Sequence, residues 1–267
     1  MMKTWLDFTD LLFLGESNHG LYFKATPPDR LSIDCDVVIK VLVRDSSDEQ
    51  WQSVAQEIRL LNELSSEWIV KILDTGHDHG RLYYAMEYAV IGTLARSSRK
   101  LTIREKVTAL SHGVRGLGLL HEKGIIHRDI KPSKILVHEQ GGKLNDLGIA
   151  EKHQSDENSI PTGSIGFMAP EIAKGEQAIP ASDIFSIGAT LHLLLTKKSI
   201  YPNVPKTNLL DAVEHVAKVD PVIVFDDSKP LLMDIMLQCL KIDNKDRIKS
   251  ATEVANRLDL AIKKELE

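Results

Sequence analysis

Residues 127–137, HRDIKPSKILV, carry the side chains best suited to chemistry. They match the pattern H-R-D-x-K-P-x-N of a phosphoryl-transfer catalytic loop at every fixed position except the last. There Lys134 replaces an Asn whose side-chain oxygen would bind a metal ion. A protonated Lys has three donors and no lone pair, so it cannot be that ligand. The loop predicts either an enzyme with an altered metal site or an enzyme fold that has lost its chemistry.

Further motifs accompany this loop in a fixed order between residues 11 and 260. They are FLGESNHGLYFKA, VVIKVL, QEIRLLNEL, HRDIKPSK, LNDLGIA, GSIGFMAPE, SDIFSIG and a late DR. Single motifs of this kind are weak, but eight in order at regular spacing are specific. Together they resemble the eukaryotic-like (Hanks-type) Ser/Thr protein kinase family, particularly its compact bacterial members. The resemblance implies transfer of the ATP γ-phosphate to protein hydroxyls, with ATP and Mg²⁺ as cofactors.

The resemblance assigns catalytic roles to four charged residues. Asp129 resembles the base that accepts the proton of the substrate hydroxyl, and Lys131 resembles the residue that steadies the γ-phosphate. Lys40 follows the apolar run VVI, and Glu57 lies on the helix expected after it. Their separation suits an ion pair that holds the ammonium over the α- and β-phosphates. Two unrelated surface charges are the alternative interpretation of this pair.

The metal site is predicted at Asp146, in the sequence NDLG, which resembles the family's Mg²⁺ ligand. An ordinary turn with Asp before Gly is the alternative. Lys134 has two interpretations. Its ammonium replaces the charge of a second Mg²⁺ beside the phosphates, or it pairs with Asp129 or Asp146 and competes with the first Mg²⁺.

The stretch expected to cover the nucleotide departs from the family pattern G-x-G-x-x-G. GESNHG supplies Gly15 and Gly20 but has Ser17 in the middle, which restricts the approach of the backbone to the phosphates. Tyr22 and Val38 are larger than the Val and Ala usual at their positions, so a tight base pocket is expected. The remaining cofactor-binding candidates are the gatekeeper Met86, the backbone of Glu87 and Ala89 in the hinge, and Leu136, although YYAMEY also reads as a core strand.

A polar stretch, EKHQSDENSIPTGS, follows Asp146 and suits a mobile loop. Ser155, Ser159 and Thr162 in this stretch are possible phosphorylation targets, and Ser159 and Thr162 are the preferred candidates. Arg128 supplies a guanidinium that can pair with a phosphate there. Ordinary solvated hydroxyls are the alternative.

The resemblance also implies residues that support the site rather than react. A hydroxyl is expected to shape the substrate site, an ion pair to hold the large lobe together, and a carboxylate to brace the catalytic loop. These residues are Ser164 against Asp129 and Lys131, the pair Glu171 and Arg247, and Asp183.

The elements that must position these side chains divide the chain into two parts. Residues 11–43, 70–76 and 81–89 read as strands of one antiparallel sheet, and residues 46–64 as one helix. From Leu101 the periodicity predicts helices over 102–124, 182–196, 229–241 and 250–267. The expected fold is α+β and two-lobed: one kinase domain over 1–267, with a small lobe of sheet plus helix over 1–88, a hinge near 87–92, and a mainly helical large lobe over 93–267.

Composition narrows the class of protein. Apolar residues make up 43% and charged residues 27%, as in an ordinary globular protein. The net charge of -5 argues against a dedicated nucleic-acid or anionic-membrane binder. Cys35 and Cys239 lack metal-site spacing, so a reducing cytoplasm is the expected location. Asp7 and Asp10 interrupt the apolar core that a secretion signal needs, and no apolar stretch reaches the about 20 residues of a membrane span.

Three functions are compatible with these residues. The leading one is an ATP-dependent Ser/Thr protein kinase, favoured because Lys40, Glu57, Asp129, Lys131 and Asp146 are all retained. The second is a pseudokinase acting as a nucleotide-binding or protein-binding regulatory switch, which the departures at the glycine-rich stretch and the catalytic loop favour. The third is a small-molecule kinase of the antibiotic-phosphorylating kind, which would not need MAPE after a Ser-bearing substrate loop.

Overall fold

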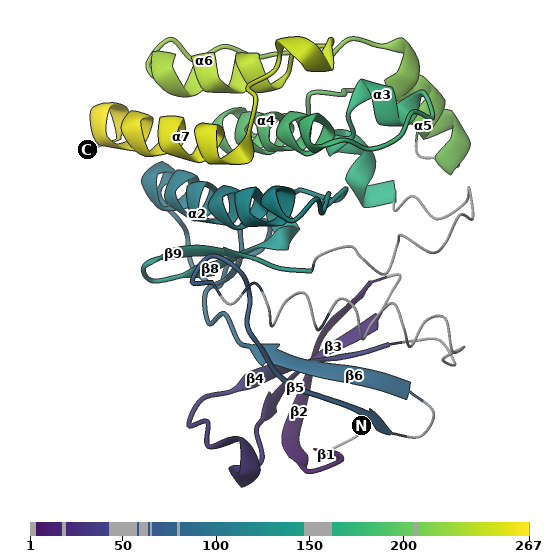
Figure 1. Cartoon of the computed structure of the whole chain (residues 1–267), viewed down its shortest axis with the longest axis vertical. Helices are drawn as coiled ribbons and strands as arrows, with labels where there is room; N and C mark the ends of the chain where they lie inside the picture. The colour runs from purple at the N-terminus through teal and green to yellow at the C-terminus, as the bar shows by residue number, and fades with distance from the viewer. Residues whose placement is uncertain are drawn as a thin grey trace. The chain divides into compact units, whose positions relative to one another are not determined.

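The computed structural model of the chain describes residues 4–17, 20–42, 58, 64, 66–78, 81–146, 162–205 and 208–266. Its described residues up to Val90 form one compact unit, and those from Ile91 onward form a second. The first unit is an antiparallel sheet and the second is mostly helical, so the predicted α+β class is confirmed (Figure 1). The helix predicted over 46–64 lies outside the described residues, apart from Ile58, which is helical, and Leu64.

The sheet of the first unit has six strands in the order β1-β2-β3-β4-β6-β5, and every neighbouring pair is antiparallel. The strands predicted within 11–43, 70–76 and 81–89 are present. Strand β1 and the first residues of β2 were not predicted. Two residues, the length of β1, are too few to show the alternation of a strand. The strands are β1 (Thr4–Trp5), β2 (Phe8–Ser17), β3 (Gly20–Thr26), β4 (Val37–Val41), β5 (Ile72–Asp78) and β6 (Arg81–Glu87).

Strand β4 lies in the middle of this sheet and is buried at every position. Successive side chains of a strand point to opposite faces, so its residues divide into two sets. Val37, Ile39 and Val41 join an apolar cluster with Trp5 and Phe8. Val38 and Lys40 therefore face the other side of the sheet, together with their cross-strand partners Met86 and Tyr22.

Helices α2, α4, α6 and α7 of the second unit run side by side in Figure 1, and α4 packs against both α2 and α6. Most positions of α4 are buried, which explains its apolar character on all sides. The four predicted helices are present; α3 and α5 were not predicted. No helix within the described ranges is both long and apolar enough to cross a membrane. The helices are α2 (Ile103–Glu122), α3 (Pro170–Ala173), α4 (Pro180–Thr196), α5 (Leu209–Lys218), α6 (Pro230–Cys239) and α7 (Ala251–Glu265).

A small sheet of order β7-β8-β9 accompanies these helices. It consists of β7 (Gly92–Thr93), β8 (Ile135–His138) and β9 (Gly141–Leu144). Strands β8 and β9 form an antiparallel hairpin in which Ile135 lies opposite Leu144. The residues just before β8 and just after β9 therefore meet at the same end of the hairpin.

His192 is a fully buried side chain of α4 whose two ring nitrogens are both used. The Val224 N–H donates to Nε2 at 3.0 Å, so the proton lies on Nδ1, which donates to the Lys198 carbonyl at 2.9 Å. Burial lowers the pKa of His192 from its ordinary value of 6.5. Burial also lowers the pKa of His127.

The stability of the chain is expected to fall as the pH is lowered through 6.5. Both histidines stay neutral in the folded state, whereas the unfolded chain binds protons there, so stability is complete above pH 6.5 and is lost below it. Each histidine contributes at most about 1.4 kcal/mol per pH unit. Urea unfolding between pH 7.5 and 5.5 measures this slope, which His192→Gln should reduce. A slope unchanged by that substitution would contradict the assignment.

Candidate active site

Asp129, Lys131 and Ser164 converge in the second unit. The Lys131 Nζ lies 2.8 Å from Asp129 Oδ1 and donates to Ser164 Oγ at 2.6 Å. The Ser164 hydroxyl in turn donates to Asp129 Oδ1 at 2.6 Å. Asp129 is 7% exposed, so the cluster consists of a nearly buried carboxylate with an ammonium and a hydroxyl on one oxygen.

The backbone of the catalytic loop is held by Asp183 of α4. The N–H groups of His127 and Arg128 each donate to the Asp183 carboxylate at 2.8 Å. Arg128 adopts a left-handed conformation with φ of 68°, a geometry that costs about 1–3 kcal/mol in a residue other than Gly. The His121 Nε2 lies 2.8 Å from Asp183 Oδ2, the oxygen that also accepts from the His127 N–H. The loop conformation before Asp129 therefore depends on a buried carboxylate of α4.

Lys134 is brought to both candidate carboxylates by the β8–β9 hairpin. Its carbonyl accepts from the Asn145 N–H at 2.8 Å, which places the following Asp146 beside it. The Lys134 ammonium donates to Asp146 Oδ2 and lies 3.3 Å from Asp129 Oδ2. One ammonium thus bridges the proposed base and the proposed metal ligand.

These cations determine the protonation of Asp129. Burial by itself would raise the pKa of the carboxyl, but the charges of Lys134 and Lys131 and the hydrogen bonds from Lys131 and Ser164 outweigh it. The pKa of Asp129 is therefore lower than its ordinary value of 3.8. The carboxylate is ionised at neutral pH and accepts a proton less readily than an isolated aspartate.

A buried ion pair supports the same unit. The Arg247 guanidinium donates to both Glu171 oxygens, at 2.7 and 2.8 Å, and to the carbonyls of Lys241 and Ala181, each at 2.8 Å. Burial would raise the pKa of Glu171, but Arg247 lowers it overall. The guanidinium also lies 4.9 Å from the ring centroid of Phe185. Its donors are thus satisfied although it is fully buried.

In the first unit, Lys40 lies between two tyrosine rings. Tyr22 of β3 and Tyr84 of β6 are its direct cross-strand partners, and their ring centroids are 5.5 and 5.4 Å from Nζ. Cation–π contacts at this distance contribute about 0.5–2 kcal/mol each. The sequence predicts Tyr22 as a bulky residue of the base pocket. Its ring also contacts Lys40, the candidate phosphate-binding lysine.

The backbone geometry at Gly15 and the packing at Gly20, in the candidate phosphate loop, both favour glycine. Gly15 has a φ of 154°, and a Cβ on Gly20 would lie 2.8 Å from the Val41 carbonyl oxygen. Strands β2 and β3 remain paired as far as Ser17 and Gly20. The close approach of Gly20 to β4 is a packing requirement in addition to any contact with phosphate.

The remaining nucleotide candidates are mostly buried. Val38 lies opposite Met86 in the sheet, and the Glu87 N–H donates to the Lys71 carbonyl at 3.3 Å. A contact of Glu87 with a base would therefore use its carbonyl oxygen. Ala89 is buried in the first unit and Leu136 is buried on β8 of the second.

Several predicted residues lie outside what the structure describes. Glu57, Ser155 and Ser159 fall in ranges that are not described, whereas Ser17 ends β2 and Thr162 begins the 3-10 helix η4 (Thr162–Phe167). Across the described ranges, no group of three His, Cys, Asp or Glu side chains could hold a metal ion. His121 was missed because a histidine in the last turn of a helix has no distinctive signal in the sequence.

Comparison with known proteins identifies the family of this chain. Residues 10–258 match the protein kinase domain family. The chain belongs to this family, which confirms the resemblance seen in its motifs.

Individual relatives come from plants, bacteria and fungi. The chain is 31% identical over 242 residues to MAP3K epsilon protein kinase 1 of Arabidopsis thaliana, covering 88% of this chain and 17% of the relative. It is 34% identical over 205 residues to serine/threonine-protein kinase PknK of Mycobacterium bovis, covering 73% and 18%. It is 30% identical over 247 residues to serine/threonine-protein kinase ppk11 of Schizosaccharomyces pombe, covering 90% and 77%. The chain thus spans less than a fifth of the length of the first two relatives.

Proposed function

We propose that the chain is an ATP-dependent serine/threonine protein kinase. The observation that carries this proposal is the cluster of Asp129, Lys131 and Ser164, in which an ionised carboxylate lies beside an ammonium. Transfer of a phosphoryl group needs a proton acceptor for the attacking hydroxyl and a positive charge for the phosphoryl oxygens. Both groups are present on one loop.

In the proposed reaction, the oxygen of a substrate Ser or Thr forms a bond to the γ-phosphorus while the bond to the ADP oxygen breaks. Asp129 accepts the hydroxyl proton. Its two oxygens offer about four lone-pair sites, so it can accept this bond in addition to those from Ser164 and Lys131. Lys131 stabilises negative charge on the transferred group, and the arrangement of the loop by Asp183 keeps both side chains in position.

Asp146 is the residue that would hold Mg²⁺. Magnesium commonly binds proteins through one or two carboxylates together with substrate phosphates, and an Asp146 carboxylate fits that donor set. Lys134 does not fit it, because an ammonium has no lone pair. When bound, the ion would neutralise charge on the phosphates. Lys134 would compete with the ion for this contact, since its ammonium donates to the same carboxylate.

The first unit is proposed to bind ATP. Lys40 would contact the α- and β-phosphates in partnership with Glu57, with Gly15, Ser17 and Gly20 covering them. The base would contact Tyr22, Val38, Met86 and Ala89 and the carbonyl of Glu87. We further propose that residues 1–88 and 93–267 act as two lobes of one kinase domain joined by a hinge near 87–92.

A cytoplasmic location and a protein substrate complete the proposal. Both cysteines are free, with Cys35 exposed and Cys239 buried, as expected in a reducing compartment. Burial raises the pKa of the Cys239 thiol to about 12, so it is unreactive. The net charge of -5 gives no reason to include a nucleic acid among the partners.

A pseudokinase that acts as a nucleotide-binding or protein-binding switch is the second candidate. The specific observation that favours it is the contact of Lys134 with both Asp146 and Asp129. An ammonium in this position competes with a metal ion for the same oxygen.

The test of the proposed function is phosphate transfer from radiolabelled ATP to a generic Ser/Thr protein substrate in the presence of Mg²⁺. Transfer is expected, and mass spectrometry should find phosphate on Ser159 or Thr162 of the chain itself. A melting temperature raised by ATP without any transfer would favour the pseudokinase. No transfer and no stabilisation at millimolar ATP would contradict the kinase and the nucleotide-binding switch.

Replacing Lys134 with Asn is expected to increase kcat by about tenfold or more, equivalent to at least about 1.4 kcal/mol in the barrier. The substitution removes the ammonium from Asp146 and restores an oxygen ligand, so binding of Mg²⁺ should improve. Steady-state kinetics across a Mg²⁺ series measure the effect. Lys123→Asn, which changes an exposed lysine at the end of α2, is the matched control. A lower kcat for Lys134→Asn would mean that the ammonium itself takes the place of the metal.

A further inference from the structure

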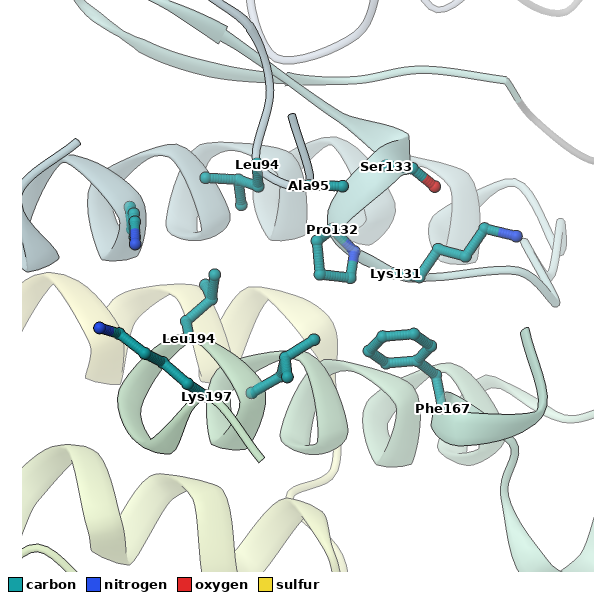
Figure 2. Close-up of a pocket in the computed structure, with 10 residues that line it drawn as sticks. Leu94, Ala95, Lys131, Pro132, Ser133, Phe167, Leu194 and Lys197 are labelled. Carbon is teal, nitrogen blue, oxygen red and sulfur yellow. The ribbon is translucent and has the colours of Figure 1, made fainter. Parts of the chain in front are cut away.

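A pocket of about 560 Å³ lies in the second unit, where α2, α4 and the catalytic loop meet (Figure 2). Leu94, Pro132, Phe167 and Leu194 contribute apolar surface to it. Pockets of this size accommodate small ligands or a few side chains of a bound peptide. It is therefore large enough for a short segment of another chain.

The pocket is continuous with the proposed catalytic cluster through Lys131. This side chain lines the pocket while its ammonium contacts Asp129 and Ser164. Figure 2 shows Lys131 and Phe167 at one end of the lining residues and Lys197 at the other. A ligand whose hydroxyl reaches Asp129 would thus have its neighbouring residues in or beside the pocket.

All charged side chains that line the pocket are positive. Lys106, Lys131 and Lys197 line the pocket, and no Asp or Glu is among its lining residues. Within the described part of the chain, neither Lys106 nor Lys197 has an ion pair or a side-chain hydrogen bond. Glu105, the neighbour of Lys106, is already bound by Arg99 at 2.6 Å. These two lysines therefore retain their charge for a ligand.

We propose that this pocket binds an acidic segment of the protein substrate, one that carries Asp or Glu close to the acceptor Ser or Thr. The apolar residues would contact the aliphatic parts of the segment, and Lys106 and Lys197 would pair with its carboxylates. A basic segment would be repelled by the same lysines. The inference rests on the proposed kinase function, because it names the substrate class of the same site.

Binding is tested apart from catalysis with fluorescently labelled peptides in which Ala replaces the acceptor Ser. Three peptides differ only in the residues on both sides of this Ala, which are Glu, Gln or Lys. Fluorescence anisotropy is expected to show the Glu peptide binding about tenfold more tightly than the Gln peptide, with the Lys peptide weakest. The preference should decrease in 0.5 M salt, where the screening length is only about 3–5 Å.

Charge reversal of the pocket provides the decisive comparison. The Lys106→Glu/Lys197→Glu variant should prefer the Lys peptide, and Lys106→Gln/Lys197→Gln should lose the preference without reversing it. The matched control Lys123→Glu/Lys198→Glu changes two exposed lysines that do not line the pocket, and it should keep the wild-type preference. Thermal melting of all variants verifies that they fold.

Each outcome bears on the proposal. Equal binding of the three peptides, no binding of the Glu peptide, or an equal effect of the control variant would overturn it. Selective binding of the Glu peptide without phosphate transfer to its Ser counterpart would support the pocket and contradict the kinase function. Transfer to Ser peptides with no preference for flanking acidic residues would contradict the pocket alone.

Discussion

Replacing Arg247 with Met is expected to lower the free energy of unfolding by about 3–5 kcal/mol, because it leaves the Glu171 carboxylate buried without its cation. Glu171 would retain only the Ser182 hydroxyl, at 2.8 Å, among the side-chain donors that the structure gives it. The carbonyls of Lys241 and Ala181 would also lose their donor. Urea unfolding followed by circular dichroism measures the loss.

The double variant Arg247→Met/Glu171→Leu is expected to recover part of this loss, since neither charge then remains buried alone. Arg257→Met is the matched control. Arg257 pairs with Glu253 on the surface of α7, where the side chains are both 38% exposed, and its loss should cost less than about 1 kcal/mol. Equal losses of unfolding free energy for Arg247→Met and Arg257→Met would show that burial does not determine how much the Glu171–Arg247 pair stabilises the fold.

Replacing Asp129 with Asn is expected to reduce kcat by about 10²–10⁴-fold, the usual contribution of a general base. An Asn side chain has nearly the same size and still accepts the hydrogen bond from Ser164, so the melting temperature and ATP affinity should change little. Asp227→Asn, at an exposed position, is the matched control and should leave kcat unchanged. The measurement is kcat against a Ser/Thr substrate at saturating Mg²⁺ and ATP.

An Asp129→Asn variant with unchanged kcat would mean that another group accepts the proton. In that case the cluster with Lys131 and Ser164 would have a structural role. A loss of kcat accompanied by a large fall in melting temperature would instead show that the substitution acts through the fold.

Much of the fold could be predicted from the sequence because its signals are local. The apolar run at 37–41 predicts a buried strand, and helices such as α2 and α7 follow from apolar residues spaced along one face, whereas α4 is apolar on all sides. The short strands β1 and β7 carry too few residues for a period to appear. Helix α5 has the sequence LLDAVEHVAK, whose apolar residues repeat along one face. This pattern would have predicted the helix, but the sequence analysis did not use it.

The candidate site was predictable in its residue types and in several contacts, such as that of Ser164 with Asp129, but Lys134 was left with two interpretations. The motifs name Lys134 and Asp146, yet their contact depends on the register of β8 and β9, which pairs Ile135 with Leu144. Register is determined by a turn and by packing over the whole hairpin, so no local pattern reveals it. The same holds for Tyr22, whose contact with Lys40 depends on the pairing of β3 and β4.

Lys134 differs from a dissolved cation because it is covalently part of the chain. A bound ion exchanges with the solvent, and its occupancy follows its concentration in the cell. The ammonium between Asp129 and Asp146 is instead part of the polypeptide, so every molecule carries it at any ion concentration. An incoming ion must then compete with an ammonium that is tethered beside the same carboxylates. Such a site would need a higher magnesium concentration to load than the same site without the ammonium.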